Sequence, residues 1–221
     1  SLDEKICLYA EEDTPRLKNL EATKSDYLVI IDPLDGTANY LGNINKSTSS
    51  IKSFKPETNY GIMISLYKSG SPVSSIIFIP FTDTMYIAQK DKTYCISNGH
   101  KKPVSLKSVF PANICYHNSW IEKDTQAVAK IKRLWISRFL HCSVSSVADL
   151  MTGKAQCFVM KNVLINDYAA PIHIYKAAGG TVLNQDKVFP AVVKNKLREP
   201  WIAMANKKKI AYDLIDHMTG N

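Results

Sequence analysis

The residues best suited to chemistry are two aspartates three positions apart, Asp32 and Asp35, in the run Asp-Pro-Leu-Asp-Gly-Thr-Ala-Asn-Tyr at 32–40. They follow a short aliphatic run at 27–31, which predicts a buried strand that stops at Asp32. Two neighbouring carboxylates repel each other, and a divalent cation is the usual means of keeping both charged. Oxygen ligands favour magnesium over zinc. The segment therefore predicts a magnesium site, with an Asp-Pro turn before an Asx-capped helix as the alternative.

Gly36 adds a second feature to this segment, because glycine permits a tight turn and a close approach of a ligand to the backbone. If a helical turn begins near Gly36, its first N–H groups have no partner within the helix and suit a phosphate. Asp32 and Asp35 would then point toward the same place.

Two more acidic features lie elsewhere in the chain. Glu11 and Glu12 follow a short apolar run at 6–10, and Asp167 precedes a predicted helix at 167–178. Taken alone, the glutamates are most simply a solvated turn and Asp167 an ordinary helix N-cap. Their placement after a strand and before a helix also suits two further metal ligands and a base.

The elements that must position these acids are strands and helices mixed without strict alternation. The strands at 61–67, 73–80 and 84–89 suggest an antiparallel meander, and 40–60 is expected to be a long surface loop. The fold class is therefore layered α/β or α+β. The remaining expected elements are helices at 125–134, 143–152 and 208–218 and strands at 157–160 and 201–205.

Composition narrows the class of protein. The 221 residues are 45% hydrophobic, which predicts one domain at 1–221, in two packed lobes at about 1–110 and 111–221. No apolar run is long enough to span a membrane and the first residues do not form a signal peptide, so we expect a cytoplasmic protein. The five cysteines are scattered, which favours reduced thiols. The net charge of +8 attracts anions, including a phosphorylated substrate or, less favoured, nucleic acid.

The three acidic segments occur in an order that resembles the inositol monophosphatase family. The pattern is Glu-Glu at 11–12, then Asp-Pro-Leu-Asp-Gly-Thr at 32–37, then Asn-Asp-Tyr-Ala-Ala at 166–170 before Ala-Ala-Gly-Gly at 177–180. The resemblance implies a magnesium-dependent, lithium-sensitive phosphomonoesterase with two or three Mg²⁺ ions per site. It also implies a homodimer, and a chain that lacks the family's N-terminal helices.

The resemblance also implies roles for the metal ligands. Asp32 would bridge two metal ions, and Glu11 would bind the first ion and help to activate water. The main-chain carbonyl of Leu34 would add a ligand there, while Asp35 and Asp167 would hold the second ion.

Other residues of the same motif are expected to act on the phosphate. Thr37 would hydrogen-bond the nucleophilic water, and the amides of Gly36 and Thr37, beside Asp35, would bind the phosphate. A metal-activated water requires no covalent nucleophile. Consistent with this, the sequence has neither a GxSxG elbow nor a P-loop.

The substrate and even the role stay open at this point. Inositol phosphatases place a glutamate where this chain has Met160, so a sugar phosphate or 3′-phosphoadenosine 5′-phosphate competes with inositol phosphate as substrate. The alternative function is a regulatory protein on the same fold that binds RNA or the transcription machinery.

Overall fold

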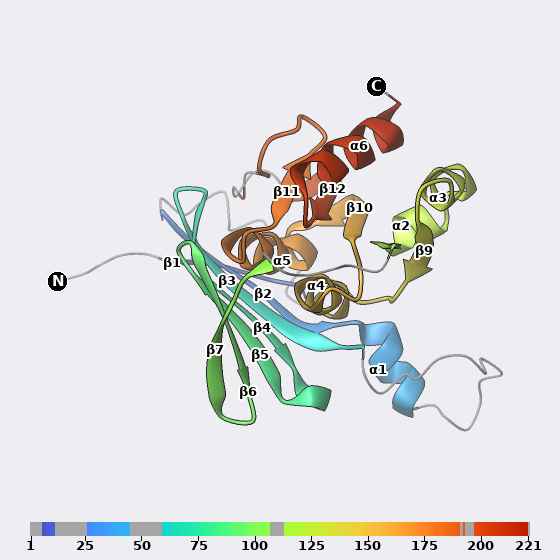
Figure 1. Cartoon of the computed structure of the whole chain (residues 1–221). Helices are drawn as coiled ribbons and strands as arrows, with labels where there is room; N and C mark the ends of the chain where they lie inside the picture. The colour runs from blue at the N-terminus through green and yellow to red at the C-terminus, as the bar shows by residue number, and fades with distance from the viewer. Residues whose placement is uncertain are drawn as a thin grey trace.

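The computed structural model describes residues 6–11, 26–44, 59–106, 113–190, 192 and 197–220. Two sheets with helices between and outside them make up the fold (Figure 1). This arrangement confirms the layered α/β class. Glu12, most of the expected 40–60 loop and the final residue lie outside the described residues.

The first sheet has seven strands in chain order, β1-β2-β3-β4-β5-β6-β7. β1 runs parallel to β2, and every later neighbour is antiparallel, so the expected meander is present and is longer than predicted. The strands are β1 (Ile6–Ala10), β2 (Tyr27–Asp35), β3 (Gly61–Lys68), β4 (Ser71–Ile79), β5 (Thr84–Gln89), β6 (Lys92–Ser97) and β7 (His100–Val104).

The second sheet has five strands in the order β11-β12-β10-β8-β9. β10 lies near its centre, antiparallel to β12 and parallel to β8. The strands are β8 (Ile114–His117), β9 (Ile136–Phe139), β10 (Cys157–Leu164), β11 (Thr181–Asn184) and β12 (Arg198–Ala205).

The helices occupy three places. α4 (Ser143–Thr152) and α5 (Ile165–Ala177) lie between the sheets, and α5 contacts strands of both. α2 (Ser119–Glu122), α3 (Thr125–Lys132) and α6 (Lys208–Thr219) lie on the far side of the five-stranded sheet (Figure 1). α1 (Thr37–Ile44) continues from the end of β2. α5 is thus an element that joins the two sheets.

Buried polar contacts fix α5 against the seven-stranded sheet. The Tyr67 hydroxyl donates to the Ala169 carbonyl at 2.7 Å, and the Thr93 hydroxyl donates to the Ile174 carbonyl at 2.8 Å. His173 bonds the Ser75 hydroxyl through Nδ1 and the Lys90 carbonyl through Nε2. Because these groups are hydrogen-bonded within the core, they position the helix without a large desolvation penalty.

Element boundaries differ from the prediction in several places; β10 (Cys157–Leu164) and β12 (Arg198–Ala205), for example, are longer than the predicted 157–160 and 201–205. β2 continues through Asp35 and does not stop at Asp32, and α5 begins at Ile165, two residues before Asp167. Residues 40–44 belong to α1 and not to the expected loop. All five cysteines are free, and four of them are buried, as expected for reduced thiols.

Candidate active site

A β-bulge brings Asp32 and Asp35 to one side of β2. In a regular strand, residues three apart point to opposite faces. Here Asp32 pairs with Met63 and Asp35 with Gly61, so β2 carries one extra residue over this stretch. Because of this extra residue, the side chains of Asp32 and Asp35 lie on the same side of β2. Both aspartates are buried, at 1% and 9% exposure.

Glu11 reaches the same place because β1 and β2 are parallel. Ala10 pairs with Ile31, and the Glu11 amide donates to the Ile31 carbonyl at 3.3 Å. Glu11 and Asp32 are therefore the next residues after a paired position in each strand. The carboxyl ends of neighbouring parallel strands meet at one edge, which places the two acids side by side.

Asp167 lies in the first turn of α5, the helix between the two sheets. Carboxylate oxygens of Glu11, Asp32 and Asp167 lie within 4.8 Å of one another. The structure therefore brings together three of the four carboxylates that the sequence proposed as ligands. The Nδ2 of Asn166 donates to Oδ1 of Asp167 at 2.7 Å and orients that carboxylate.

The electrostatics of this cluster are unfavourable for three bare carboxylates. Burial, followed by the charges of Asp35 and Glu11, raises the pKa of Asp32 to about 9. Burial and the same two charges raise the pKa of Asp167 to about 8. A bound divalent cation would remove both causes, because it replaces the lost solvation and screens the repulsion. The oxygen-only donor set fits a hard cation such as Mg²⁺.

Asp35 adjoins this cluster but is held by the start of α4. Its Oδ2 accepts a hydrogen bond from the Cys142 thiol at 2.9 Å and another from the Val144 amide at 2.7 Å. Burial raises the pKa of Asp35, and these hydrogen bonds oppose the rise. The sequence reasoning missed Cys142 and Val144. The only available signal was the helix start at Ser143, which places free backbone N–H groups at this point.

The turn after β2 positions the remaining predicted residues. The Thr37 hydroxyl donates to the Leu34 carbonyl at 2.8 Å, so the carbonyl keeps one lone pair and the hydroxyl keeps both of its lone pairs for other partners. Gly36 has φ +85°, and a Cβ there would lie 2.5 Å from the Asn59 carbonyl oxygen. Asn39 is buried and donates to the carbonyls of Asn59 and Leu140, which ties α1 to two other segments.

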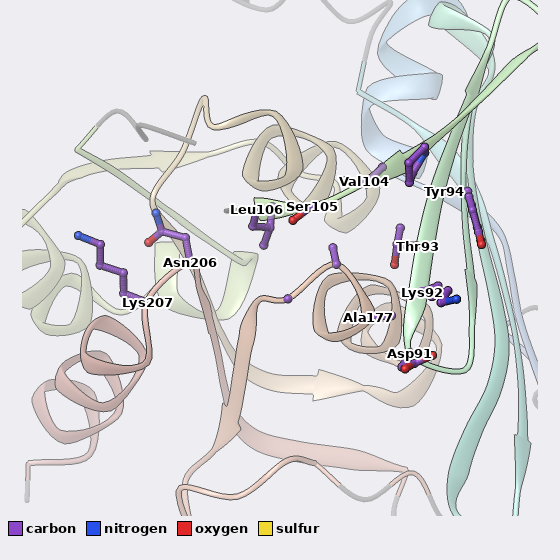
Figure 2. A pocket seen from close by; sticks show the side chains of 13 residues that line it. Asp91, Lys92, Thr93, Tyr94, Val104, Ser105, Leu106, Ala177, Asn206 and Lys207 are labelled. Carbon is purple, nitrogen blue, oxygen red and sulfur yellow. The ribbon is translucent and has the colours of Figure 1, made fainter. Parts of the chain in front are cut away.

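A cavity of about 280 Å³ adjoins the acidic cluster. Its lining includes Asp35, Asp167, residues around the β8–α2 and β9–α4 connections, and single residues of α1 and β10. Met160 is fully buried and is not among the residues that line this cavity. A larger cavity of about 660 Å³ lies elsewhere, between the β6–β7 hairpin, the end of α5 and Lys207 (Figure 2). None of the predicted site residues lines it.

The fold and site define a layered α/β protein with a carboxylate cluster suited to a hard cation. The sequence model of the inositol monophosphatase family matches residues 4–218, so the chain belongs to that family. Among the described residues, no helix is long and apolar enough to cross a membrane.

Two relatives match the chain at low sequence identity. The chain is 23% identical over 192 residues to the Nus factor SuhB of Xylella fastidiosa, covering 84% of this chain and 65% of that protein. It is 22% identical over 200 residues to the fructose-1,6-bisphosphatase/inositol-1-monophosphatase of Thermotoga maritima, covering 89% and 72%. The chain thus spans about two thirds of the length of the SuhB relative.

A solved structure has the same fold. An inositol monophosphatase/NADP phosphatase complexed with Mg²⁺ and phosphate superposes with a TM-score of 0.70 at 18% identity, covering 98% of this chain and 74% of that one. At this identity the similarity establishes the fold alone.

Proposed function

We propose that this protein hydrolyses a small phosphate monoester with magnesium at the cluster of Glu11, Asp32 and Asp167. The observation that carries the proposal is the convergence of these three carboxylates within 4.8 Å, from β1, β2 and α5. Folding alone gains nothing from such a cluster, since burial and mutual repulsion raise two of the three pKa values. Family membership supports the same reaction class.

The residues present fit the cation. Glu11, Asp32 and Asp167 supply carboxylates, the Leu34 carbonyl adds a neutral oxygen, and Asp35 retains an oxygen that Cys142 and Val144 do not engage. Magnesium bound there would neutralise the phosphate and lower the pKa of a water. The related structure with Mg²⁺ and phosphate supports this ligand pair.

The chain's own groups would bind and orient the reactants. Gly36 begins the turn into α1, and the first amides of α1, including that of Thr37, have no partner within the helix, so they suit a phosphate oxygen. The Thr37 hydroxyl already donates to Leu34 and therefore acts as an acceptor toward the nucleophilic water. Glu11, exposed at the edge of the cluster, is the base in this scheme.

Phosphate release from a panel of inositol, sugar and nucleotide monoesters, with and without Mg²⁺, tests the proposal. We expect Mg²⁺-dependent release by the wild type and loss of that release in Asp32→Asn. Circular dichroism would verify that the variant is folded. Release that needs no divalent cation, or that survives in Asp32→Asn, would refute the assigned site. The panel also separates inositol-1-phosphate from other substrates, and added Li⁺ tests the expected lithium sensitivity.

A second candidate function is a regulatory protein that binds RNA or the transcription machinery. The similarity to a Nus factor and the net charge of +8 favour it. Such binding would survive Asp32→Asn, and its affinity for RNA would fall steeply with salt. A gel-shift titration at two salt concentrations distinguishes this activity from phosphatase turnover.

Three further predictions concern the protein's setting. We propose a homodimer, a cytoplasmic location and two packed lobes at about 1–110 and 111–221. Light scattering of the purified chain tests the first, and limited proteolysis near residue 110 tests the last.

A further inference from the structure

Asn166 is a buried asparagine in the first turn of α5, next to the acid that this helix contributes to the cluster. It is 1% exposed, and its Nδ2 donates to Oδ1 of Asp167 at 2.7 Å. Neighbouring residues of a helix do not normally face each other, because each residue turns the chain by about 100°. The contact between these two side chains is therefore a specific feature of this turn and not a consequence of helical geometry.

The orientation of this amide follows from its neighbour. Turning the amide around would place its oxygen against a carboxylate, which has no proton to donate when it is ionised. With Nδ2 toward Asp167, Oδ1 of Asn166 is buried and has no hydrogen-bond partner among the described residues. A buried acceptor without a partner lowers stability, whereas an apolar side chain of similar size would avoid this cost. Folding therefore gains little from the amide, and what the amide does provide is the hydrogen bond to Asp167.

The aspartates of the site are held in different ways. The Leu34 amide donates to Oδ1 of Asp32 at 3.0 Å, and the Val144 amide donates to Asp35. Asp167 instead accepts from a neighbouring side chain, which a substitution can remove without changing the backbone. A neutral N–H engages one lone pair of a carboxylate and fixes its orientation, but it adds no positive charge that would repel a cation.

We infer that Asn166 is a positioning residue for the metal site: its amide holds the Asp167 carboxylate toward the other two acids of the cluster before a cation binds. The remaining lone pairs of Asp167 are then available to the ion. The three carboxylates, whose oxygens already lie within 4.8 Å of one another, need little rearrangement to bind it. The inference rests on the proposed function, since it takes this cluster to be the Mg²⁺ site. It gives a part in metal binding to a residue outside the set of ligands.

Substitution of Asn166 separates metal affinity from stability. Calorimetric titration of Mg²⁺ at one pH and in one buffer gives the Kd, and urea denaturation in EDTA gives the free energy of unfolding. We expect Asn166→Leu to raise the Kd by about tenfold or more, as the loss of a hydrogen-bond partner of a metal ligand does. The same variant should be at least as stable as the wild type without metal, because it removes the buried unpaired oxygen. A residue needed only for folding would not give weaker binding at unchanged stability.

A destabilised control keeps the test decisive if leucine does not fit. Asn166→Ala removes the amide and leaves a cavity, and Ile202→Ala leaves a cavity at a fully buried position of β12. Ile202 belongs neither to the cluster nor to the residues that line the cavity beside it. We expect only Asn166→Ala to raise the Kd, although both variants lose stability. A wild-type Kd in Asn166→Leu, an equal Kd in the two alanine variants, or failure of both Asn166 variants to fold would overturn the inference.

The inference and the proposed function can fail separately. Wild type that binds Mg²⁺ but releases no phosphate from any ester would refute the proposed function, and the Kd of Asn166→Leu would still decide the inference. Mg²⁺-dependent release by the wild type, with the same Kd in Asn166→Leu, would overturn the inference alone. Folded wild type that binds no Mg²⁺ would overturn both.

Discussion

The two sheets bury their side chains in different ways. In β10 of the five-stranded sheet, four consecutive residues, 157–160, are each at most 2% exposed. Odd and even positions belong to separate core clusters, one with α3 and α6 and the other with α4 and α5. In β1 of the seven-stranded sheet, Cys7 is buried whereas Ile6 and Leu8 are 61% and 50% exposed. Among the described helices, α4 and α5 pack on one face of that sheet (Figure 1).

The difference shows where this fold has room for chemistry. Among the described residues, helices cover both faces of the five-stranded sheet, and α5, which packs against it, contributes Asp167 to the acidic cluster. Glu11 directly follows β1, and Asp32 lies near the end of β2, in the sheet that α4 and α5 cover on one face. The acids thus come from strand ends and from a first helical turn.

The largest expected effect concerns Asp167, the acid that α5 contributes to the cluster. Asp167→Asn keeps the side chain's shape but removes a metal-facing charge, so Mg²⁺-dependent phosphate release should fall about 1000-fold, the equivalent of about 4 kcal/mol. Asp213→Asn, in an exposed pair with Lys209 on α6, should change release by less than about twofold. Equal activity in the two variants would remove α5 from the site.

A matched pair of isoleucines tests the burial difference itself. Ile202 in β12 is fully buried, so Ile202→Ala should lower the free energy of unfolding by about 2–5 kcal/mol. Ile64 in β3 is 37% exposed, and Ile64→Ala should cost less than about 1.5 kcal/mol. Urea denaturation measures both. Equal costs would contradict the comparison and would mean that the outer face of the seven-stranded sheet is covered in solution.

A pair of glycine substitutions separates the cost of a positive φ from the cost of a steric clash. Gly36 and Gly99 both have positive φ, but only at Gly36 would a Cβ meet other atoms, the nearest at 2.5 Å. Gly99→Ala should cost about 1 kcal/mol, and Gly36→Ala about 3 kcal/mol with loss of phosphate release. Thermal melts of both variants check this. An equal loss of stability in the two variants would show that the turn at Gly36 is not tightly packed.

A last prediction concerns the pH dependence of the metal-free protein. The raised pKa values of Asp32, to about 9, and Asp167, to about 8, mean that the folded state holds protons that the unfolded state releases. Stability should therefore fall as the pH rises from about 5 toward 9, and Mg²⁺ should reverse the fall. Melting temperatures across this range, with EDTA or Mg²⁺, measure it. If the melting temperature in EDTA did not change with pH in either the wild type or Asp32→Asn, the clustering of these carboxylates would be contradicted.

Much of the fold followed from local patterns. The aliphatic run at 27–31 and the apolar spacing at 208–218 gave a strand and a helix, because packing in each case follows the local period. The helix at 143–152 was predicted with its observed bounds, since Gly153 ends it in a left-handed conformation. The start of α5 was wrong by two residues because Leu164 precedes it without a capping side chain.

The site was only partly accessible from sequence. Asp32, Asp35 and Asp167 could be singled out by type and order, but the bulge that turns Asp35 to the side of Asp32 depends on the register with Gly61 and Met63. The thiol of Cys142 reaches Asp35 from a residue 107 positions away. The stacked rings of His117 in β8 and Phe139 in β9 likewise lie together because these two strands pair. Such contacts join residues that are far apart in the sequence, which no local pattern encodes.

Calorimetric titration of Mg²⁺ into the metal-free protein tests the central claim most directly. We predict saturable binding by the wild type, with proton release near pH 7.5 that changes the observed heat between buffers of different ionisation enthalpy, because Asp32 and Asp167 must lose protons to bind the cation. Asp32→Asn should bind far more weakly, while Asp213→Asn should match the wild type. Folded wild type that binds no Mg²⁺, or Asp32→Asn that binds it equally well, would contradict the assignment of this cluster as a metal site.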